Sequence, residues 1–251
     1  MDLHLDGRVY VVSGASAGIG AAIADALIAE GARVCGFSRT GSELDDGRRL
    51  FVRADAGDDA AVAAVVRRCR ERFGRIDGVV ANAGRGGRAA ADAPIEMWRN
   101  QFDVKVAHAV NLVEAAHQDL QQSEHAAIVL INAVSAHTPD SGMAPVCAAR
   151  AALASYAVSL SDRLASDGIR VVCVNVGVID TERQRERHRA SGSGADYPTW
   201  REAEAARRGV PLRRMGVASE VADTVAFLLS PRSAYTTGTS IDVAGGLSAR
   251  M

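Results

Sequence analysis

Short β-branched runs alternate with alanine-rich helical stretches from one end of the chain to the other. Strands are expected at residues 8–13, 32–37, 50–53, 76–81, 127–132, 169–175 and 239–243. Amphipathic helical segments are expected near residues 18–30, 58–73, 95–120, 145–166 and 219–229. Strands that alternate with helices are joined by right-handed crossovers, which produce a parallel sheet covered on both faces. The pattern predicts one α/β domain over residues 1–251, a doubly wound parallel sheet of about seven strands.

Composition narrows the class of protein. With 251 residues, 48% of them hydrophobic, the chain can bury one core, and no Pro- or Ser-rich linker divides it. A net charge of −1 gives no basic field for nucleic acid. The N-terminus lacks the features of a signal peptide, and no apolar stretch approaches the length of a membrane span. We therefore expect a cytoplasmic protein whose partners include neither nucleic acid nor membrane.

The four cysteines are scattered without the spacing of a metal site. They are Cys35, Cys69, Cys147 and Cys173. Three of them lie in apolar or alanine-rich runs, which is typical of small core residues in a reduced compartment. No metal site is expected.

A glycine-rich turn follows the first strand, in the segment Ser13-Gly14-Ala15-Ser16-Ala17-Gly18-Ile19-Gly20. Gly14 permits a tight turn out of the strand, Gly18 lets the backbone approach a pyrophosphate, and Gly20 allows close helix packing. Glycines also mark ordinary strand-to-helix turns. The position of this set between a strand and a helix favours a dinucleotide site.

The end of the second strand bears on which dinucleotide binds. Sites that prefer NAD place an acid there to hold the ribose hydroxyls, whereas this chain has Ser38 followed by Arg39. An arginine at this place can pair with a 2′-phosphate through charge-assisted hydrogen bonds. NADP(H) is therefore favoured over NAD(H), the alternative being a surface arginine in a turn.

At this point the sequence resembles the short-chain dehydrogenase/reductase family along nearly its whole length. Asp55 resembles the family's adenine-contacting acid, and Ala81-Asn82-Ala83-Gly84 resembles its strand end with one Asn changed. A C-terminal pattern supports the resemblance: Pro211 to Gly216, Glu220-Val221-Ala222, Phe227 to Ser230, Thr237-Gly238 and Gly245-Gly246. The resemblance implies a Rossmann-like fold, oxidoreductase activity and assembly into a homo- or hetero-oligomer, a dimer or tetramer of such subunits.

The glycine motif and the resemblance together imply a set of coenzyme-binding residues. They are Gly14, Ser16, Gly18, Ile19, Gly20, Ser38, Arg39, Asp55, Ala56, Asn82, Ala83, Gly84, Arg150, Gly177, Ile179 and Thr181. The last three lie in a segment similar to the family's nicotinamide-cupping loop. Val176 there replaces a proline, and Ala244 replaces an aspartate near the C-terminus.

The family's Asn-Ser-Tyr-Lys tetrad falls on four changed positions. Counting from Trp98 places the Asn at Lys105, the only lysine in the sequence. The strand at 127–132 leads into Ala133 at the place of the Ser, with Ser135 two residues on. The Tyr then falls on Val146 and the Lys on Arg150.

These changes alter the chemistry that the resemblance implies. Val146 has no proton to give, and the pKa of the Arg150 guanidinium is too high for an acid, although it can hold the ribose. Lys105 can carry a proton if burial and Arg150 lower its pKa. Two cations at these positions favour an anionic substrate or transition state. The alternative is that Lys105 and Arg150 fill space in a site that has lost its use.

Residues 182–216 interrupt the alternation with a charged segment that contains Ser191-Gly192-Ser193-Gly194. A long insert after the sixth strand is typical of a lid over a ligand site. A solvated helix of alternating charge is an equally good interpretation. In the loop after the fifth strand, His137 and Asp140 are minor candidates for a site role.

Three functions fit these features. The first is an atypical NADP(H)-dependent oxidoreductase, a reductase of a small, anionic or conjugated metabolite that works without the family's Tyr acid, with Lys105 and Arg150 as catalytic candidates. The second is a catalytically silent subunit that pairs with an active homologue. The third is a non-redox isomerase, cyclase or lyase. Halohydrin-type lyases also have Arg at the Lys position, but they keep Ser and Tyr and lose the glycine motif, so this function fits least well. Neither the substrate nor the reaction direction follows from the sequence.

Overall fold

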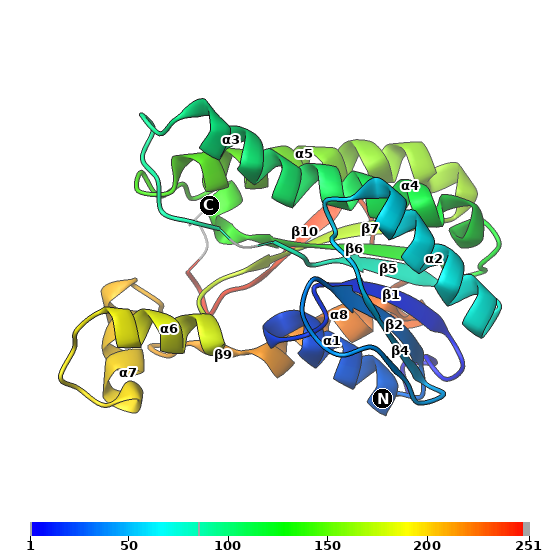
Figure 1. The fold of residues 1–251 in the computed structure, drawn as a ribbon, viewed down its shortest axis with the longest axis horizontal. Helices are drawn as coiled ribbons and strands as arrows, with labels where there is room; N and C mark the ends of the chain where they lie inside the picture. The colour runs from blue at the N-terminus through cyan, green and yellow to red at the C-terminus, as the bar shows by residue number, and fades with distance from the viewer. Residues whose placement is uncertain (1, 85, 248–251) are drawn as a thin grey trace.

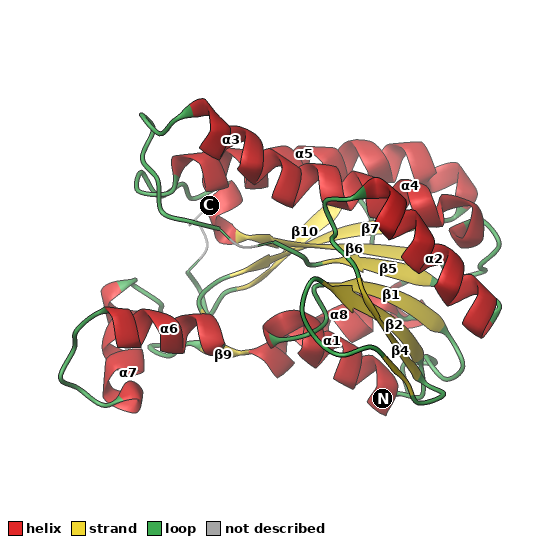
Figure 2. Ribbon diagram, viewed as in Figure 1, coloured by secondary structure: helices red, strands yellow, loops and turns green. Residues whose placement is uncertain are grey.

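The computed structural model describes residues 2–84 and 86–247 and shows one mixed sheet of eight strands flanked by helices (Figures 1 and 2). The strand order is β10-β7-β6-β5-β1-β2-β4-β3. The strands are β1 (Val9–Ser13), β2 (Arg33–Ser38), β3 (Leu44–Asp45), β4 (Arg49–Arg53), β5 (Gly78–Ala81), β6 (Ala127–Ala133), β7 (Arg170–Val176) and β10 (Thr239–Val243). The predicted doubly wound fold is confirmed.

Seven of these strands are parallel and correspond to the seven that the sequence predicts. They form because β-branched residues fill positions buried on both faces, as in β1 and β7, which are buried along their whole lengths. The eighth strand, β3, pairs antiparallel with β4 at the edge of the sheet. Its two residues are exposed and carry no apolar pattern. This edge strand therefore could not be predicted from the residue pattern.

Helices cover both faces of the sheet. The α-helices among the described residues, not all of which lie on the sheet, are α1 (Gly18–Ala29), α2 (Asp59–Phe73), α3 (Ile95–Phe102), α4 (His108–Leu120), α5 (Ala144–Leu164), α6 (Glu182–Ala190), α7 (Tyr197–Arg207) and α8 (Ala218–Leu229). One buried cluster joins α2, α4 and α5 to the sheet, and a second joins α1 and α8 to its other face. Figure 1 shows these two layers above and below the strands. All four cysteines are buried and free, as expected.

The segment expected as one helix over residues 95–120 is divided. A π-helical turn, Asp103–Ala107, separates α3 from α4. A π turn inserts an extra residue into the helical ladder, and such turns occur frequently at functional sites. The buried residue of this turn is Lys105. The expected single helix is therefore two α-helices, with Lys105 in the π turn between them.

Residues 182–216 contain two helices, α6 and α7. Helices α6 and α7 stand out from the body at one end of the sheet, as Figure 1 shows. A two-stranded sheet of β8 (Ile179–Asp180) and β9 (Gly216–Val217) connects them to it. Their own small core includes Val178, Ala205 and Met215. The pair is therefore an ordered unit with few attachments to the main sheet.

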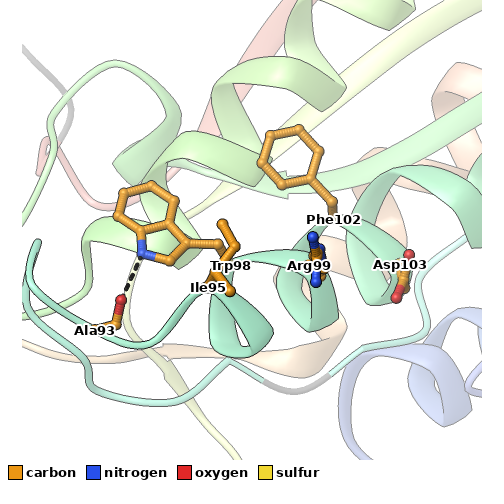
Figure 3. Close-up of a pocket in the computed structure, with 6 residues that line it drawn as sticks. All are labelled: Ala93, Ile95, Trp98, Arg99, Phe102 and Asp103. Atoms are coloured by element: carbon orange, nitrogen blue, oxygen red, sulfur yellow. Dashed lines mark hydrogen bonds between the residues drawn. The ribbon is translucent and has the colours of Figure 1, made fainter.

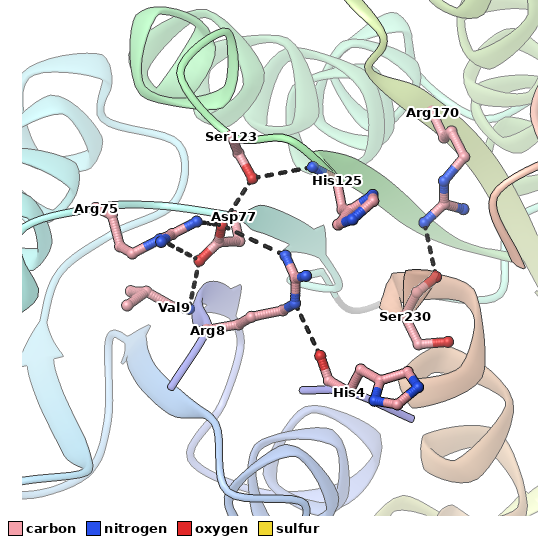
Figure 4. Close-up of polar contacts among 9 residues, drawn as sticks. All are labelled: His4, Arg8, Val9, Arg75, Asp77, Ser123, His125, Arg170 and Ser230. Carbon is pink, nitrogen blue, oxygen red and sulfur yellow. Dashed lines mark hydrogen bonds and ion pairs between the residues drawn. The ribbon is translucent and has the colours of Figure 1, made fainter. Parts of the chain in front are cut away.

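A buried carboxylate secures the opposite end of the sheet (Figure 4). Asp77 is fully buried and accepts hydrogen bonds from the Val9 backbone N–H (2.9 Å), from Arg75 Nη2 (2.5 Å) and from Ser123 Oγ (2.7 Å). Nearby, Arg170 Nη2 donates to the Ser230 carbonyl at 3.1 Å. A buried charge is tolerated only when it is paired and hydrogen-bonded in this way. These contacts are structural and lie away from the strand ends where ligands bind.

Among the described residues, no helix is both long enough and apolar enough to cross a membrane.

Candidate coenzyme and catalytic site

The carboxyl ends of β1 and β5 meet at one edge of the sheet, where ligands bind in doubly wound folds. Ser13, buried at the end of β1, accepts hydrogen bonds from the Asn82 and Ala83 backbone N–H groups at 2.9 and 3.0 Å. In return, Asn82 Nδ2 donates to the carbonyls of Ser13 (3.1 Å) and Gly14 (3.3 Å). Asn82 and Ala83 therefore hold the start of the glycine-rich turn in place.

The glycines of that turn are required by its geometry. Gly14 and Gly18 have φ of 67° and 58°, a region that L side chains rarely adopt. A Cβ on Gly20 would lie 2.2 Å from the Gly14 carbonyl oxygen. No side chain caps α1 at Ala17, and its first turn holds no acid. The N–H groups at this helix end are therefore open to an anion. The turn that contains Gly14, Gly18 and Gly20, here called the coenzyme cradle, fits a pyrophosphate.

Thr181 closes the other side of this cradle. A Cβ on Gly18 would lie 3.6 Å from Thr181 Cγ2, so Thr181, the residue before α6, lies close to the start of α1. Ile179 is buried in the short β8 strand, and Gly177 donates from its N–H to the Val243 carbonyl at 3.0 Å. A Cβ on Gly177 would come within 2.8 Å of Ala244 Cα. The segment implied to contact nicotinamide thus lies beside the glycine-rich turn.

The end of β2 presents polar groups next to the same turn. Ser38 Oγ donates to the Thr40 carbonyl, and Ser16 Oγ lies 3.3 Å from Thr40 Oγ1. Arg39 is exposed, and its carbonyl accepts from Arg53 Nε at 3.1 Å. Sequence reasoning missed Arg53 as a candidate. Only the pairing of Ser38 with Arg53 between β2 and β4 brings this second guanidinium to the site.

The implied adenine contacts follow β4. Asp55 is exposed and accepts from the Gly57 N–H through Oδ1 at 3.0 Å, in the turn that leads to α2. Ala56 is partly buried against the core. One oxygen of Asp55 therefore fixes the turn.

The four positions of the implied tetrad come together near the ends of β5 and β6. Val146 is buried beside Gly86, and a Cβ added to this glycine would lie 3.3 Å from both valine methyl carbons. Ala133 ends β6, opposite Val176 in the ladder. Arg150 lies one helical turn after Val146, so both side chains share a face of α5. Neither Val146 nor Ala133 carries a group that transfers a proton.

Arg150 is held by Asn132, which is fully buried near the end of β6. Arg150 Nη1 donates to Asn132 Oδ1 at 3.3 Å, and Asn132 Nδ2 donates to the Arg150 carbonyl at 3.1 Å. Burial, followed by the charge of Arg183, lowers the pKa of Arg150 to about 10. The guanidinium therefore stays charged at neutral pH and is not an acid in that range.

Lys105 is 3% exposed, and its Nζ has no hydrogen-bond partner among the described residues. A Cβ on the exposed Gly84 would come within 2.7 Å of Nζ, so the amine lies directly behind this glycine. Burial lowers the pKa of Lys105 to about 6, with further contributions from the charges of Arg150 and Arg183. An amine with this pKa exchanges its proton near physiological pH.

His108 is a second buried titratable group and was not a candidate from the sequence. It lies three residues after Lys105, and its Nε2 has no hydrogen-bond partner among the described residues. Burial, then the Lys105 charge, lowers the pKa of His108 to about 4. The imidazole is therefore neutral beside the amine. No sequence signal distinguishes it from the partly buried His117.

The two minor candidates after β6 lie on the surface of this region. His137 Nε2 is 3.5 Å from Asp242 Oδ2, and Asp140 Oδ2 is 3.9 Å from Arg88 Nη1. Neither contact reaches Lys105.

Comparison with known proteins places these features in a family. The family profile described as Enoyl-(Acyl carrier protein) reductase matches residues 14–248. The 3-oxoacyl-[acyl-carrier-protein] reductase FabG of Escherichia coli (strain K12) is 31% identical over 254 residues, covering 98% of this chain and 99% of the relative. The 2,3-dihydro-2,3-dihydroxybenzoate dehydrogenase of the same organism is 32% identical over 253 residues, covering 97% and 98%.

Solved structures agree. A short-chain oxidoreductase of Pseudomonas aeruginosa PAO1, described as containing an atypical catalytic center, superposes with a TM-score of 0.93 at 32% identity, over 98% of this chain and 99% of that one. L-Sorbose reductase of Gluconobacter frateurii, complexed with NADPH and L-sorbose, superposes with a TM-score of 0.91 at 28% identity over 100% of both chains. This chain therefore belongs to the short-chain dehydrogenase/reductase family of oxidoreductases.

Proposed function

We propose that the chain is an NADP(H)-dependent reductase in which Lys105 supplies the proton that a tyrosine supplies elsewhere in the family. The observation that carries the proposal is the buried Lys105 amine, unpartnered among the described residues and with a pKa of about 6. In this proposal the tetrad is degenerate at all four positions: Lys105, Ala133, Val146 and Arg150. The P. aeruginosa relative supports it, because that protein is described as having an atypical catalytic center.

Preference for NADP(H) is supported at the end of β2. Arg39 directly follows Ser38, and Arg53 pairs with Ser38 across the strands and donates from Nε to the Arg39 carbonyl, so two arginines stand at the strand end where a 2′-phosphate is expected. A second structure of the P. aeruginosa relative contains NADPH and has a TM-score of 0.90 with this chain. The L-sorbose reductase complex also contains NADPH.

In the proposed complex, residues of this chain would hold the pyrophosphate and border the nicotinamide. The uncapped α1 N-terminus and Thr181 would hold the pyrophosphate, while Gly177 and Ile179 would border the nicotinamide. Gly84 would let the ring region approach Lys105, since any side chain there would meet Nζ. When bound, the coenzyme supplies a hydride.

The proton is assigned to Lys105. A carbonyl that gains a hydride at carbon must gain a proton at oxygen, and the Lys105 ammonium donates it through Nζ. Arg150 stays charged and stabilises the developing negative charge on that oxygen. Because its pKa is lowered to about 4, His108 is uncharged near neutral pH and adds no second positive charge beside the Lys105 ammonium. These groups favour a small anionic or conjugated substrate over a neutral one.

We further propose that residues 182–216, with α6 and α7, form the lid of this site. Asp180 and Arg201 (2.8 Å), with Tyr197 as a second partner of Asp180, connect the base of the lid to α7. The lid follows directly on Thr181, which lies beside Gly18, so any movement of α6 would be coupled to the glycine-rich turn.

A silent subunit remains the second candidate, because α3 exposes Ile95, Met97 and Phe102 to solvent. Beside them, a hollow of about 500 Å³ is lined by Ile95, Trp98 and Phe102 (Figure 3). Trp98 Nε1 donates to the Ala93 carbonyl at 3.2 Å and fixes one wall. Apolar surface of this kind fits another subunit. Purification from the native host would show whether a tetrad-bearing homologue co-elutes.

The first test is titration of the purified protein with NADPH and NADH, followed by coenzyme fluorescence. Micromolar NADPH binding with much weaker NADH binding is expected, and absence of binding by either would refute the reductase proposal. Turnover with a panel of carbonyl compounds then tests Lys105. The group must be protonated to act, so kcat/KM for reduction should fall as pH rises above about 6. Lys105→Met should abolish turnover while leaving NADPH binding intact, and turnover retained in this variant would refute the role of Lys105.

A further inference from the structure

Three polar side chains form a row near the carboxyl ends of β6, β7 and β10. Asn132 is paired with Asn175, and Asn175 with Asp242, in the parallel register of these strands. Side chains at paired positions of neighbouring parallel strands leave the same face of the sheet. That face is covered by α5, which packs on all three strands and bonds to Asn132 through Arg150. Asn132 is fully buried and Asn175 is 2% exposed, so the two amides lie inside the protein.

The row has a charge at each end and amides between them. Within the part of the chain that the structure describes, Arg150 makes no ion pair, and its guanidinium donates to the Asn132 amide, from Nη1 to Oδ1 at 3.3 Å. At the other end, Asp242 Oδ1 accepts from Asn175 Nδ2 at 2.8 Å, and Asp242 Oδ2 lies 3.5 Å from His137 Nε2. Because strands lie about 4.8 Å apart, the backbones of Asn132 and Asp242 are roughly 10 Å apart. Two amides therefore separate the carboxylate from the guanidinium.

A neutral amide is an unusual partner for an arginine at such a place. A carboxylate is the common one, because its two oxygens give charge-assisted hydrogen bonds that offset the loss of water. Asn132 has nearly the shape of an aspartate without the charge, and its Nδ2 also donates to the Arg150 carbonyl at 3.1 Å. The row even leaves Asn175 Oδ1 buried without a hydrogen-bond partner among the described residues. Buried polar groups kept at such a cost point to a role in function.

We propose that Asn132 is a positioning residue, which fixes the Arg150 guanidinium while leaving its positive charge un-neutralised. The inference rests on the proposed function, because that function makes the Arg150 charge stabilise the negative charge that develops on the substrate oxygen. Asn132→Asp would hold the guanidinium equally well but would cancel its charge. Asn175 contributes by binding the Asp242 carboxylate at the far end of the row. The whole charge of Arg150 then remains available to the transition state.

The charge of Arg150 can be read at Lys105 without turnover, because after burial it is the next cause that lowers the pKa of Lys105. The whole protein is labelled with ¹³Cε-lysine, and its one lysine is titrated by NMR in wild type and variants. Asn132→Asp should raise the Lys105 midpoint by about one pH unit, a tenfold gain in proton affinity, and Arg150→Gln should do the same. Asn132→Leu removes the hydrogen bonds but not the charge, so its midpoint should stay close to wild type. Asp242→Asn, the reverse exchange at the far end of the row, should also leave the midpoint in place.

Turnover gives the kinetic counterpart. Asn132→Asp should lose kcat for carbonyl reduction by at least about tenfold, with KM and Tm little changed, because its guanidinium stays in place. A merely structural role would leave kcat of this near-isosteric variant close to wild type, which would overturn the inference. Equal Lys105 midpoints in wild type and Asn132→Asp, or equal shifts in Asn132→Asp and Asn132→Leu, would overturn it as well. Failure of the proposed function is separate: it appears as absent NADPH binding in wild type, whereas the midpoint shift is measured without coenzyme.

Discussion

Replacing Lys105 with Met should stabilise the protein at neutral pH. The side chain is 3% exposed, and its pKa is lowered from 10.5 to about 6, chiefly by burial. At pH 7 the unfolded chain carries the proton and the folded chain does not, and each unit of pKa shift below 10.5 costs about 1.4 kcal/mol. The wild-type penalty at pH 7 is therefore roughly 3–5 kcal/mol. Methionine keeps the apolar stem without the amine and should recover most of it.

The pH dependence makes this prediction specific. Because the folded pKa is lowered, the penalty is complete below pH 6 and disappears as pH rises toward 10.5. Urea denaturation from pH 6 to 10 should therefore show the two free energies of unfolding converging by about 1.4 kcal/mol per pH unit. Lys105→Arg, whose charge does not titrate in this range, should stay destabilised throughout. A Met variant no more stable than wild type at pH 7, or a gap that is constant with pH, would refute the reasoning.

Three further predictions concern the coenzyme cradle and the lid. Arg39→Gln should weaken NADPH binding about tenfold or more while leaving NADH binding unchanged, because only NADPH carries the 2′-phosphate; equal effects on both coenzymes would contradict this role. Gly20→Ala should abolish binding of both coenzymes, because its Cβ would meet a carbonyl oxygen at 2.2 Å, while Gly194→Ala, with open space around it, should bind normally in the same fluorescence titration. Glu204→Gln should loosen α7, because the substitution removes a carboxylate that is bound to arginines. The hydrogen bond from Arg207 is the main cause that lowers the pKa of Glu204 to about 2, so the charged carboxylate is stabilised where it lies. Limited trypsin digestion should then cut the lid several-fold faster than in wild type, and an unchanged rate would argue that the ion pairs do not hold the helix.

The sequence was sufficient for the sheet and the cradle because both depend on local signals. β-Branched runs predicted all seven parallel strands, and glycine spacing predicted the turn in which Gly14 and Gly18 adopt positive φ. The edge strand Leu44–Asp45 has no such pattern, since its residues are exposed and it exists through pairing with β4 alone.

Tertiary contacts decided the rest of the candidate site. Helical periodicity over residues 95–120 contains no sign of the π turn that buries Lys105, because α5 and the loop at Gly84 define the space around it. Arg53 reaches the end of β2 through the strand register between β2 and β4. The sequence shows which residue types occupy these positions, but it does not show which residues lie next to them in the folded protein.

The central claim is that Lys105 holds an amine able to exchange its proton near neutral pH. Because it is the only lysine, protein labelled with ¹³Cε-lysine gives a single side-chain NMR resonance, and its chemical shift can be followed from pH 5 to 11 without substrate or coenzyme. One titration with a midpoint near 6 is expected. A midpoint near the ordinary lysine value of about 10.5 would contradict it.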